Sequence, residues 1–350
     1  MLYELHEMQH ALLAPFAAAA ATGHTIFTHP QSIWTYTPVA RGVAAANELV
    51  MRLMRRYDKP EWGIDSTTIA GEPVAVSVEP RLIKPFCQLL HFKRDTKRKD
   101  PVVLVVAPLS GHHATLLRDT VRTMLPEHDV YVTQWIDARL VPVHEGPFHL
   151  DDYVEYVQEF IRLLGRDVHV ISVCQPTVPV LGAIALMASK GEKVAARTMT
   201  MMGGPIDTRK SPTEVNNFAT GRPLSWFESR VIQRVPAKYP GVGRRVYPGF
   251  LQHASFIAMN ADRHVEAHRE FFNHLVAGDG ESAHAHRRFY DEYNAVLDMP
   301  AEYYLETLRV VFKEHALPNG TWKVRGELVD PAAIRNTALF TIEGELDDIS

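Results

Sequence analysis

The chain has 350 residues, of which 46% are hydrophobic and 22% are charged, and its formal net charge is −4. This composition is ordinary for a globular protein, and the length suits one large α/β domain with an insertion. The slightly negative charge gives no electrostatic basis for binding nucleic acid. The two cysteines, Cys87 and Cys174, are too few for a disulfide framework, so we expect a reducing compartment.

An apolar segment close to the N-terminus, Ala11–Thr22, resembles the core of a signal peptide. The ten residues before it contain acids and histidines but no Lys or Arg, so the charged region of a signal peptide is missing. The apolar run is also shorter than the roughly 18 residues that cross a bilayer. We therefore predict a helix packed on the body of the protein, with no membrane span and no export signal.

Strands and helices alternate from residue 100 onwards. Continuous apolar, β-branched runs predict buried strands, and apolar residues at i, i+3, i+4 and i+7 predict helices. The clearest helix is predicted at 150–165, with Asp151 and Asp152 at its start and Gly165 at its end. Alternation of this kind indicates βαβ units and a mostly parallel sheet. The predicted strands are residues 101–108, 129–137, 167–173, 196–205 and 338–348.

The stretch between the fourth and fifth predicted strands shows no strand pattern. It has helical spacing and is rich in Phe and Tyr, which predicts a helical cap inserted into the α/β core. We predict an N-terminal helical segment and the first part of the core in residues 1–206. The cap then covers 207–335, and the chain returns to the core in 336–350.

Cys174 stands where the third predicted strand ends and an apolar helix begins. Catalytic sites of parallel sheets lie at the carboxyl ends of strands, and α/β-hydrolases hold their nucleophile at such a turn. The positive end of a helix also favours a thiolate. Ser172 and Pro176 stand where that turn usually has glycines, so the alternative is a small buried hydrophobic residue. The junction favours a nucleophilic cysteine.

An orienting acid is expected after a late strand. Asp347 fits this position, Asp348 is the second candidate, and a plain surface turn is the alternative. A catalytic histidine should follow the acid, but all 18 histidines precede Asp347. Either that histidine lies beyond the sequence, or it comes from elsewhere in the chain, or the triad interpretation is wrong.

An oxyanion hole needs two backbone N–H groups. The first is expected from Gln175, directly after the nucleophile, and the second from Leu109 or Ser110, in the loop after the first strand. His112 lies in the same loop and is predicted to line the site, with a solvated loop as the alternative. We find no metal-binding cluster, phosphate-binding loop or dinucleotide motif, so the sequence predicts neither a metal nor a cofactor.

Three segments together resemble one narrow group of proteins: SVCQPTVPVLGA (172–183), MMGGPIDTRKSPTEVN (201–216) and FTIEGELDDIS (340–350). They are similar to the intracellular poly(3-hydroxybutyrate) depolymerases, which are cysteine-type α/β-hydrolases related to the polyhydroxyalkanoate synthases. The resemblance covers the whole chain. It implies an α/β-hydrolase fold with a cap, Cys174 as nucleophile and Asp347 as acid, and a catalytic histidine beyond Ser350. It also implies hydrolysis of a storage polyester at granules in the cytoplasm.

Two other functions stay open. A polyhydroxyalkanoate synthase or acyl-CoA transferase would use the same cysteine but consume hydroxyacyl-CoA; Pro176, where synthases carry glycine, favours the depolymerase. A non-catalytic granule-surface protein would instead use the apolar N-terminal helix and the aromatic cap.

Trp226 and Phe227 are predicted to bind substrate at the edge of the cap, and the alternative is that they close the cap's own core. The sequence leaves the oligomeric state open, a homo-oligomer included.

Overall fold

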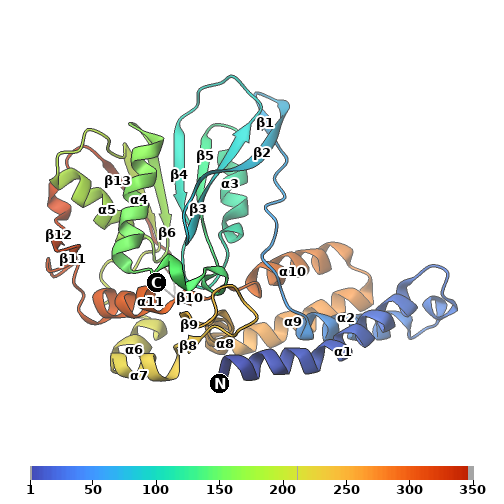
Figure 1. Ribbon diagram of the computed structural model, residues 1–350. Helices are drawn as coiled ribbons and strands as arrows, with labels where there is room; N and C mark the ends of the chain where they lie inside the picture. The colour runs from blue at the N-terminus through green and yellow to red at the C-terminus, as the bar shows by residue number, and fades with distance from the viewer. Residues whose placement is uncertain (1, 211, 346–350) are drawn as a thin grey trace. The chain divides into compact units, whose positions relative to one another are not determined.

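The computed structural model describes residues 2–210 and 212–345, apart from the side chain of residue 214 (Figure 1). The chain divides into two compact units. The first combines Met1–Pro60 with Phe250–Val296, and the second combines Glu61–Gly249 with Leu297–Ser350. The predicted cap, 207–335, is thus shared between the units, and its proposed boundaries stay predictions.

The second unit is built on an eight-stranded sheet with the order β1-β2-β3-β5-β4-β6-β7-β13. The strands from β5 to β13 along this order run parallel, whereas β1, β2 and β3 are antiparallel to their neighbours. The predicted fold class, an α/β-hydrolase fold with a mostly parallel sheet, is confirmed. The strands are β1 (Ser66–Ile69), β2 (Glu72–Ile83), β3 (Cys87–Arg94), β4 (Val102–Val106), β5 (Asp129–Trp135), β6 (His169–Val173), β7 (Thr198–Met202) and β13 (Ala338–Ile342).

Helices cover both faces of this sheet (Figure 1). Successive residues of a strand point to opposite faces, and β4 shows why its whole sequence is apolar. Val103 and Val105 pack in a cluster with Val121 of α3 (Arg118–Met124). Leu104 and Val106 pack on the other face, in a cluster with residues of α4 (Leu150–Leu164) and α5 (Thr177–Ser189). The predicted helix at 150–165 is therefore present and forms part of the core.

The predicted insertion contains strands after all, so the expectation of a strandless stretch was wrong. Each strand has only two or three residues, too few to show a period in sequence. They form a three-stranded sheet of β8 (Gln233–Arg234), β9 (Arg245–Tyr247) and β10 (Met299–Pro300), and a pair of β11 (Lys323–Val324) and β12 (Glu327–Leu328). The helices of this stretch within the second unit are α6 (Glu214–Thr220), α7 (Leu224–Arg230), α11 (Ala301–Thr307) and a π-helical turn, Leu308–Lys313.

The first unit is helical. Its N-terminal part is a hairpin of two helices joined by a loop that holds a short 3₁₀ turn, and its second part is a run of three helices. Within the hairpin the helices approach closely: a Cβ added to Gly23 would lie 2.6 Å from Oδ1 of Asn47. The elements are α1 (Leu2–Thr28), the turn η1 (Ile33–Tyr36), α2 (Ala40–Met54), α8 (Gly249–Met259), α9 (Ala261–Ala277) and α10 (Gly280–Tyr293).

Helix α1 is longer than the apolar run that predicts it. Its 27 residues make it long and apolar enough to cross a membrane by length and composition alone, a test that signal sequences and core helices also pass. The predicted helix is therefore confirmed, whereas the absence of a membrane span stays a prediction. Only Tyr3 and Ala20 of this helix are buried.

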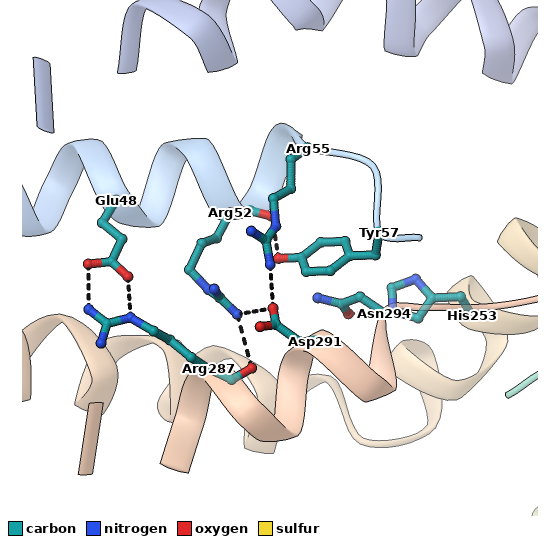
Figure 2. A network of polar contacts seen from close by, with 8 residues as sticks. All are labelled: Glu48, Arg52, Arg55, Tyr57, His253, Arg287, Asp291 and Asn294. Atoms are coloured by element: carbon teal, nitrogen blue, oxygen red, sulfur yellow. Dashed lines mark hydrogen bonds and ion pairs between the residues drawn. The ribbon is translucent and has the colours of Figure 1, made fainter. Parts of the chain in front are cut away.

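A polar network joins α2 to α10 in the first unit (Figure 2). Arg287 donates two hydrogen bonds to Glu48, at 2.5 and 2.8 Å, and Arg52 donates one to Asp291 at 2.8 Å. Arg55 contacts the same Asp291 oxygen. Burial would raise the pKa of Glu48, but hydrogen bonding and the charge of Arg287 outweigh it and lower the pKa. The interface between these helices is thus held by paired charges.

Candidate active site

The carboxyl ends of four parallel strands lie side by side at one edge of the sheet. Val106 at the end of β4 pairs with Ser172, and Val173 at the end of β6 pairs with Met202. Ile342 at the end of β13 also pairs with Met202. The loops that follow these strands therefore start next to one another. This edge is where ligands and catalytic groups collect in parallel sheets.

Cys174 begins the loop after β6 and has an unusual backbone. Its φ is +67°, in the left-handed region, where a residue with a Cβ is strained by roughly 1–2 kcal/mol. Its N–H donates to the carbonyl oxygen of Met202 at 2.7 Å, and its carbonyl accepts from the N–H of Thr177 at 3.1 Å. A strained residue on a sharp strand-to-helix turn is the geometry in which α/β-hydrolases hold a nucleophile.

The two prolines after Cys174 fit the start of α5. Pro176 is the residue before the helix, with φ −59°, and Pro179 lies within its first turn. The first N–H groups of a helix have no acceptor within the helix, so prolines there forfeit no hydrogen bond. A glycine that packs closely against the start of α5 comes instead from the chain after β7. A Cβ added to Gly204 would lie 2.0 Å from Oγ1 of Thr177, so the chain after β7 approaches α5 closely.

The predicted oxyanion donors lie in the loops after β4 and β6, and their role stays a prediction. Gln175 follows the strained turn, and Leu109 and Ser110 lie in the loop after β4. Among residues 2–210 and 212–345, no oxygen accepts a hydrogen bond from the backbone N–H of any of the three. Unpaired N–H groups are uncommon in protein interiors, and those that point into an active site serve as donors to a substrate.

The loop after β4 starts from a fixed residue, Ala107. Its N–H donates to Oγ1 of Thr133 at 2.9 Å, and its carbonyl oxygen accepts from the indole of Trp135 at 2.8 Å and from the hydroxyl of Tyr153 at 3.2 Å. These partners are buried. The side chains of β5 and α4 thus hold the start of the loop that carries Leu109.

One protein family matches the part of the chain that begins directly after β7. Residues 203–350 match the family model described as "PHB de-polymerase C-terminus". Residues 203–350 are thus similar to the C-terminal domain of PHB depolymerases, and we refer to them as the depolymerase domain. PHB is a polyester, and the depolymerases that this family model describes cleave its ester bonds. Cys174 lies before the matched domain, and Gly204 lies within it.

Solved structures resemble the chain only distantly. A bacterial membrane phospholipase A is 12% identical, with 98% of this chain and 91% of that chain covered and a TM-score of 0.37. A haloalkane dehalogenase loop variant from Bradyrhizobium elkanii is 11% identical, with 77% and 89% covered and a TM-score of 0.35. A hydrolase described as CIB-like, from Thermoplasma acidophilum, is 8% identical, with a TM-score of 0.27 and 37% of this chain covered. The chain covers 64% of that protein's length, less than two thirds.

These TM-scores are too low to bear on the fold, which the strand order establishes. A search of curated protein sequences gives no match.

The depolymerase domain supplies one contact to the candidate site that the sequence did not indicate. The hydroxyl of Tyr303, from α11, donates to Oε1 of Gln175 at 2.5 Å. Tyr303 is 1% exposed and stacks on Tyr153, with ring centroids 5.6 Å apart. Burial raises the pKa of Tyr303, so its hydroxyl stays protonated and remains a donor. The two partners are 128 positions apart, a separation over which no periodic pattern carries a signal.

The depolymerase domain also contains the predicted aromatic pair. Phe227 is fully buried, in a cluster with Ala219 and Leu308. Trp226 is half-buried, and the guanidinium of Arg222 lies 4.3 Å from its ring centroid. Of the two, only Trp226 presents part of its surface, so a role at a substrate-binding edge stays a prediction that rests on Trp226.

The remaining predicted residues are placed as follows. His112 is half-buried in the loop after β4, and its role stays a prediction. Asp347 and Asp348 lie outside the described residues, although β13, the strand before them, ends at the same edge of the sheet as β6 and β7. Cys87 is buried in β3, and burial raises the pKa of its thiol well above the usual value. Its thiolate is therefore disfavoured, in contrast to what a nucleophile requires.

A buried carboxyl pair lies just past the end of β5. Backbone N–H groups of Arg139 and Asp298 donate to Oδ1 of Asp137, at 3.1 and 3.2 Å. Burial, with the charge of Asp298 adding to it, raises the pKa of Asp137. Asp298 accepts a hydrogen bond from the N–H of Gly249 at 2.8 Å.

In the part of the chain that the structure describes, no group of three or more His, Cys, Asp or Glu residues could hold a metal ion.

Proposed function

We propose that the protein hydrolyses poly(3-hydroxybutyrate) and uses Cys174 as its nucleophile. The observation that carries this proposal is the left-handed backbone of Cys174 between β6 and α5, next to backbone N–H groups that have no acceptor among the described residues. The match to the PHB depolymerase domain supports the substrate class. The products would be shorter 3-hydroxybutyrate chains and the free acid.

The reaction proceeds in two acyl transfers. Sγ of Cys174 bonds to an ester carbonyl carbon, and its proton passes to a general base. The resulting oxyanion receives hydrogen bonds from the N–H of Gln175 and from that of Leu109 or Ser110. When the intermediate collapses, the C–O bond breaks, and the leaving alkoxide takes the proton to become a free hydroxyl end. An acyl thioester remains on Cys174.

Water then cleaves the thioester. The base takes a proton from water, the water oxygen bonds to the acyl carbon, and the C–S bond breaks to restore the thiol and release a carboxylic acid. In the family that the chain resembles, this base is a histidine. Asp347 is proposed to orient that histidine and fix its tautomer.

Replacement of the nucleophile tests this proposal. Cys174→Ala should lower the release of 3-hydroxybutyrate from amorphous polymer particles by at least about 10³-fold, because no covalent intermediate can form. Cys87→Ala is the matched control and should keep its turnover. Iodoacetamide should inactivate the protein by labelling Cys174 and not the buried Cys87, which mass mapping can check. Turnover by Cys174→Ala within about tenfold of the unchanged protein would exclude this nucleophile.

The same assay separates the alternatives. A synthase or acyl transferase would consume 3-hydroxybutyryl-CoA and lengthen polymer, so both substrates should be supplied in parallel. A non-catalytic granule-surface protein would bind particles and release no acid with or without Cys174. We also propose that the protein acts at polymer granules in the cytoplasm. Co-sedimentation of the native protein with isolated granules would test this location.

A further inference from the structure

We propose that one surface of the first unit docks on the polyester. This hairpin surface consists of the exposed apolar side chains on α1 and on the loop between α1 and α2. The inference rests on the proposed function, since it names the phase on which the hydrolase works. Its members are Leu5, Met8, Leu12 and Phe16 on α1, and Ile33, Trp34, Tyr36 and Val39 on the loop.

Large apolar side chains stand out into solvent on this surface. Ile33 is 78% exposed, Tyr36 76% and Leu12 69%. The four residues on α1 follow one another at intervals of three, four and four, so they lie on one face of the helix. Large apolar side chains exposed along one helix face and on one loop mark an interaction site more often than a free surface.

All members of the hairpin surface except Leu5, which stands between Glu4 and Glu7, lie in a segment without charge. From Met8 to Ala40 the sequence contains no Asp, Glu, Lys or Arg, although 22% of the whole chain is charged. A partner with charged groups would leave those groups desolvated and unpaired against this surface. A neutral, apolar partner fits it better, and a polyester chain carries no charge.

The loop holds its shape by its own hydrogen bonds. The hydroxyl of Tyr36 donates to the carbonyl oxygen of Pro30 at 2.9 Å, and Oγ1 of Thr35 donates to that of His29 at 2.8 Å. The N–H of Trp34 donates to Oγ of Ser32 at 3.3 Å. The exposed rings are therefore presented on an ordered loop, which lowers the entropy lost on docking.

The indole of Trp34 matches the chemistry of a polyester. A polyester backbone offers carbonyl oxygens as acceptors and has no donors of its own. Within residues 2–210 and 212–345, no oxygen accepts a hydrogen bond from the indole N–H of Trp34, which is 53% exposed. That donor is free for an ester carbonyl, while the ring packs on the apolar part of the polymer.

The other face of α1 argues against insertion across a bilayer. Arg56 pairs with Glu7, and Nε2 of His24 lies 3.6 Å from Oε2 of Glu48, both contacts between α1 and the α2 region. A spanning α1 would carry these charged partners into the hydrocarbon or break the pairs. Helices that lie on membranes usually have Lys and Arg on their polar border, and this segment has none.

Binding to particles tests the proposal, and all proteins carry Cys174→Ala so that polymer is not consumed. The triple variant Ile33→Ser, Trp34→Ser, Tyr36→Ser should bind amorphous poly(3-hydroxybutyrate) particles at least tenfold more weakly. Val265→Ser, which removes an exposed apolar side chain outside the hairpin surface, is the matched control and should bind normally. The conservative variant Trp34→Phe, Tyr36→Phe keeps the aromatic rings but lacks the indole donor and the Tyr36 hydroxyl, so its binding should fall between that of the triple variant and that of the protein without loop substitutions. Circular dichroism of each variant checks that the helices persist.

Each outcome is decisive. Equal particle binding by the triple variant overturns the proposal. Tighter binding of the protein without loop substitutions to phosphatidylcholine–phosphatidylglycerol vesicles than to particles also overturns it. A dimer that forms through the hairpin surface, and whose dissociation leaves particle binding unchanged, overturns it as well. Turnover of a soluble 3-hydroxybutyrate trimer, measured with Cys174 present, is independent of docking. If the trimer is not hydrolysed, the proposed function is refuted and the docking proposal is not. If a triple variant that no longer binds particles still hydrolyses the trimer, the result supports docking.

Discussion

The strained backbone at Cys174 can be measured by comparing glycine with alanine. Both Cys174→Gly and Cys174→Ala remove the thiol, so their difference in unfolding free energy reports the backbone. At φ +67° a residue with a Cβ costs roughly 1–2 kcal/mol, a cost that glycine avoids. Glycine loses about 0.5–1 kcal/mol more conformational entropy on folding. We therefore expect the glycine variant to be more stable by about 0.5–1 kcal/mol.

The other cysteine supplies a matched control. Cys87 lies in β3, where glycine has no conformational advantage and alanine should be the more stable variant. Subtracting the contrast at Cys87 from that at Cys174 removes the entropy of the unfolded chain and leaves the strain, about 1–2 kcal/mol. Urea unfolding of the four variants, followed by tryptophan fluorescence, gives both contrasts. The same sign at both positions would refute the assignment of strain to Cys174.

Three further predictions follow from contacts described above. Gly204→Ala should lower stability by about 1–3 kcal/mol, because its Cβ would overlap Thr177; unchanged urea unfolding would contradict the close approach. Tyr303→Phe should cost about 1–3 kcal/mol by leaving the side-chain oxygen Oε1 of Gln175 without a donor, and a smaller loss would show that this oxygen finds another donor. Burial, with nearby cationic groups, lowers the pKa of His286 from 6.5 to about 4. Since the unfolded chain then binds a proton more readily than the folded one, the first unit should lose stability as the pH falls from 6.5 to about 4. Hydrogen exchange across the pH range should show a shallower loss for His286→Phe, and an unchanged loss would exclude this residue as the source.

The parts of the fold that sequence predicts are those with strong local patterns. The run that forms β4 is apolar because both faces of the strand are buried, and α4 has an uninterrupted helical period. Strands β2 and β3 were missed, because they mix exposed and buried residues and contain polar side chains such as Gln88 and His91. An antiparallel strand with one wetter face gives a weaker signal than a parallel strand of the interior.

The candidate site divides in the same way. Cys174 could be proposed from sequence because its junction between a strand and a helix is a local pattern, and its backbone at that junction is left-handed. The contact of Tyr303 with Gln175 depends on how α11 packs, and no local pattern encodes that packing. The same holds for Trp226 and Phe227, which are adjacent in sequence but differ in exposure because Phe227 packs in a cluster with Leu308.

The attachment of the second segment of the first unit has a consequence for how the protein could have arisen. The chain leaves the second unit after Gly249 and returns at Leu297. The N–H of Gly249 is bound by Asp298, and the N–H of Leu297 donates to the carbonyl oxygen of Gly111 at 2.8 Å. Because the two ends of the excursion meet, closing the chain without it would need only a short turn and little loop-closure entropy. The helices α8 to α10 therefore have the connectivity of an insertion between two neighbouring points of the second unit.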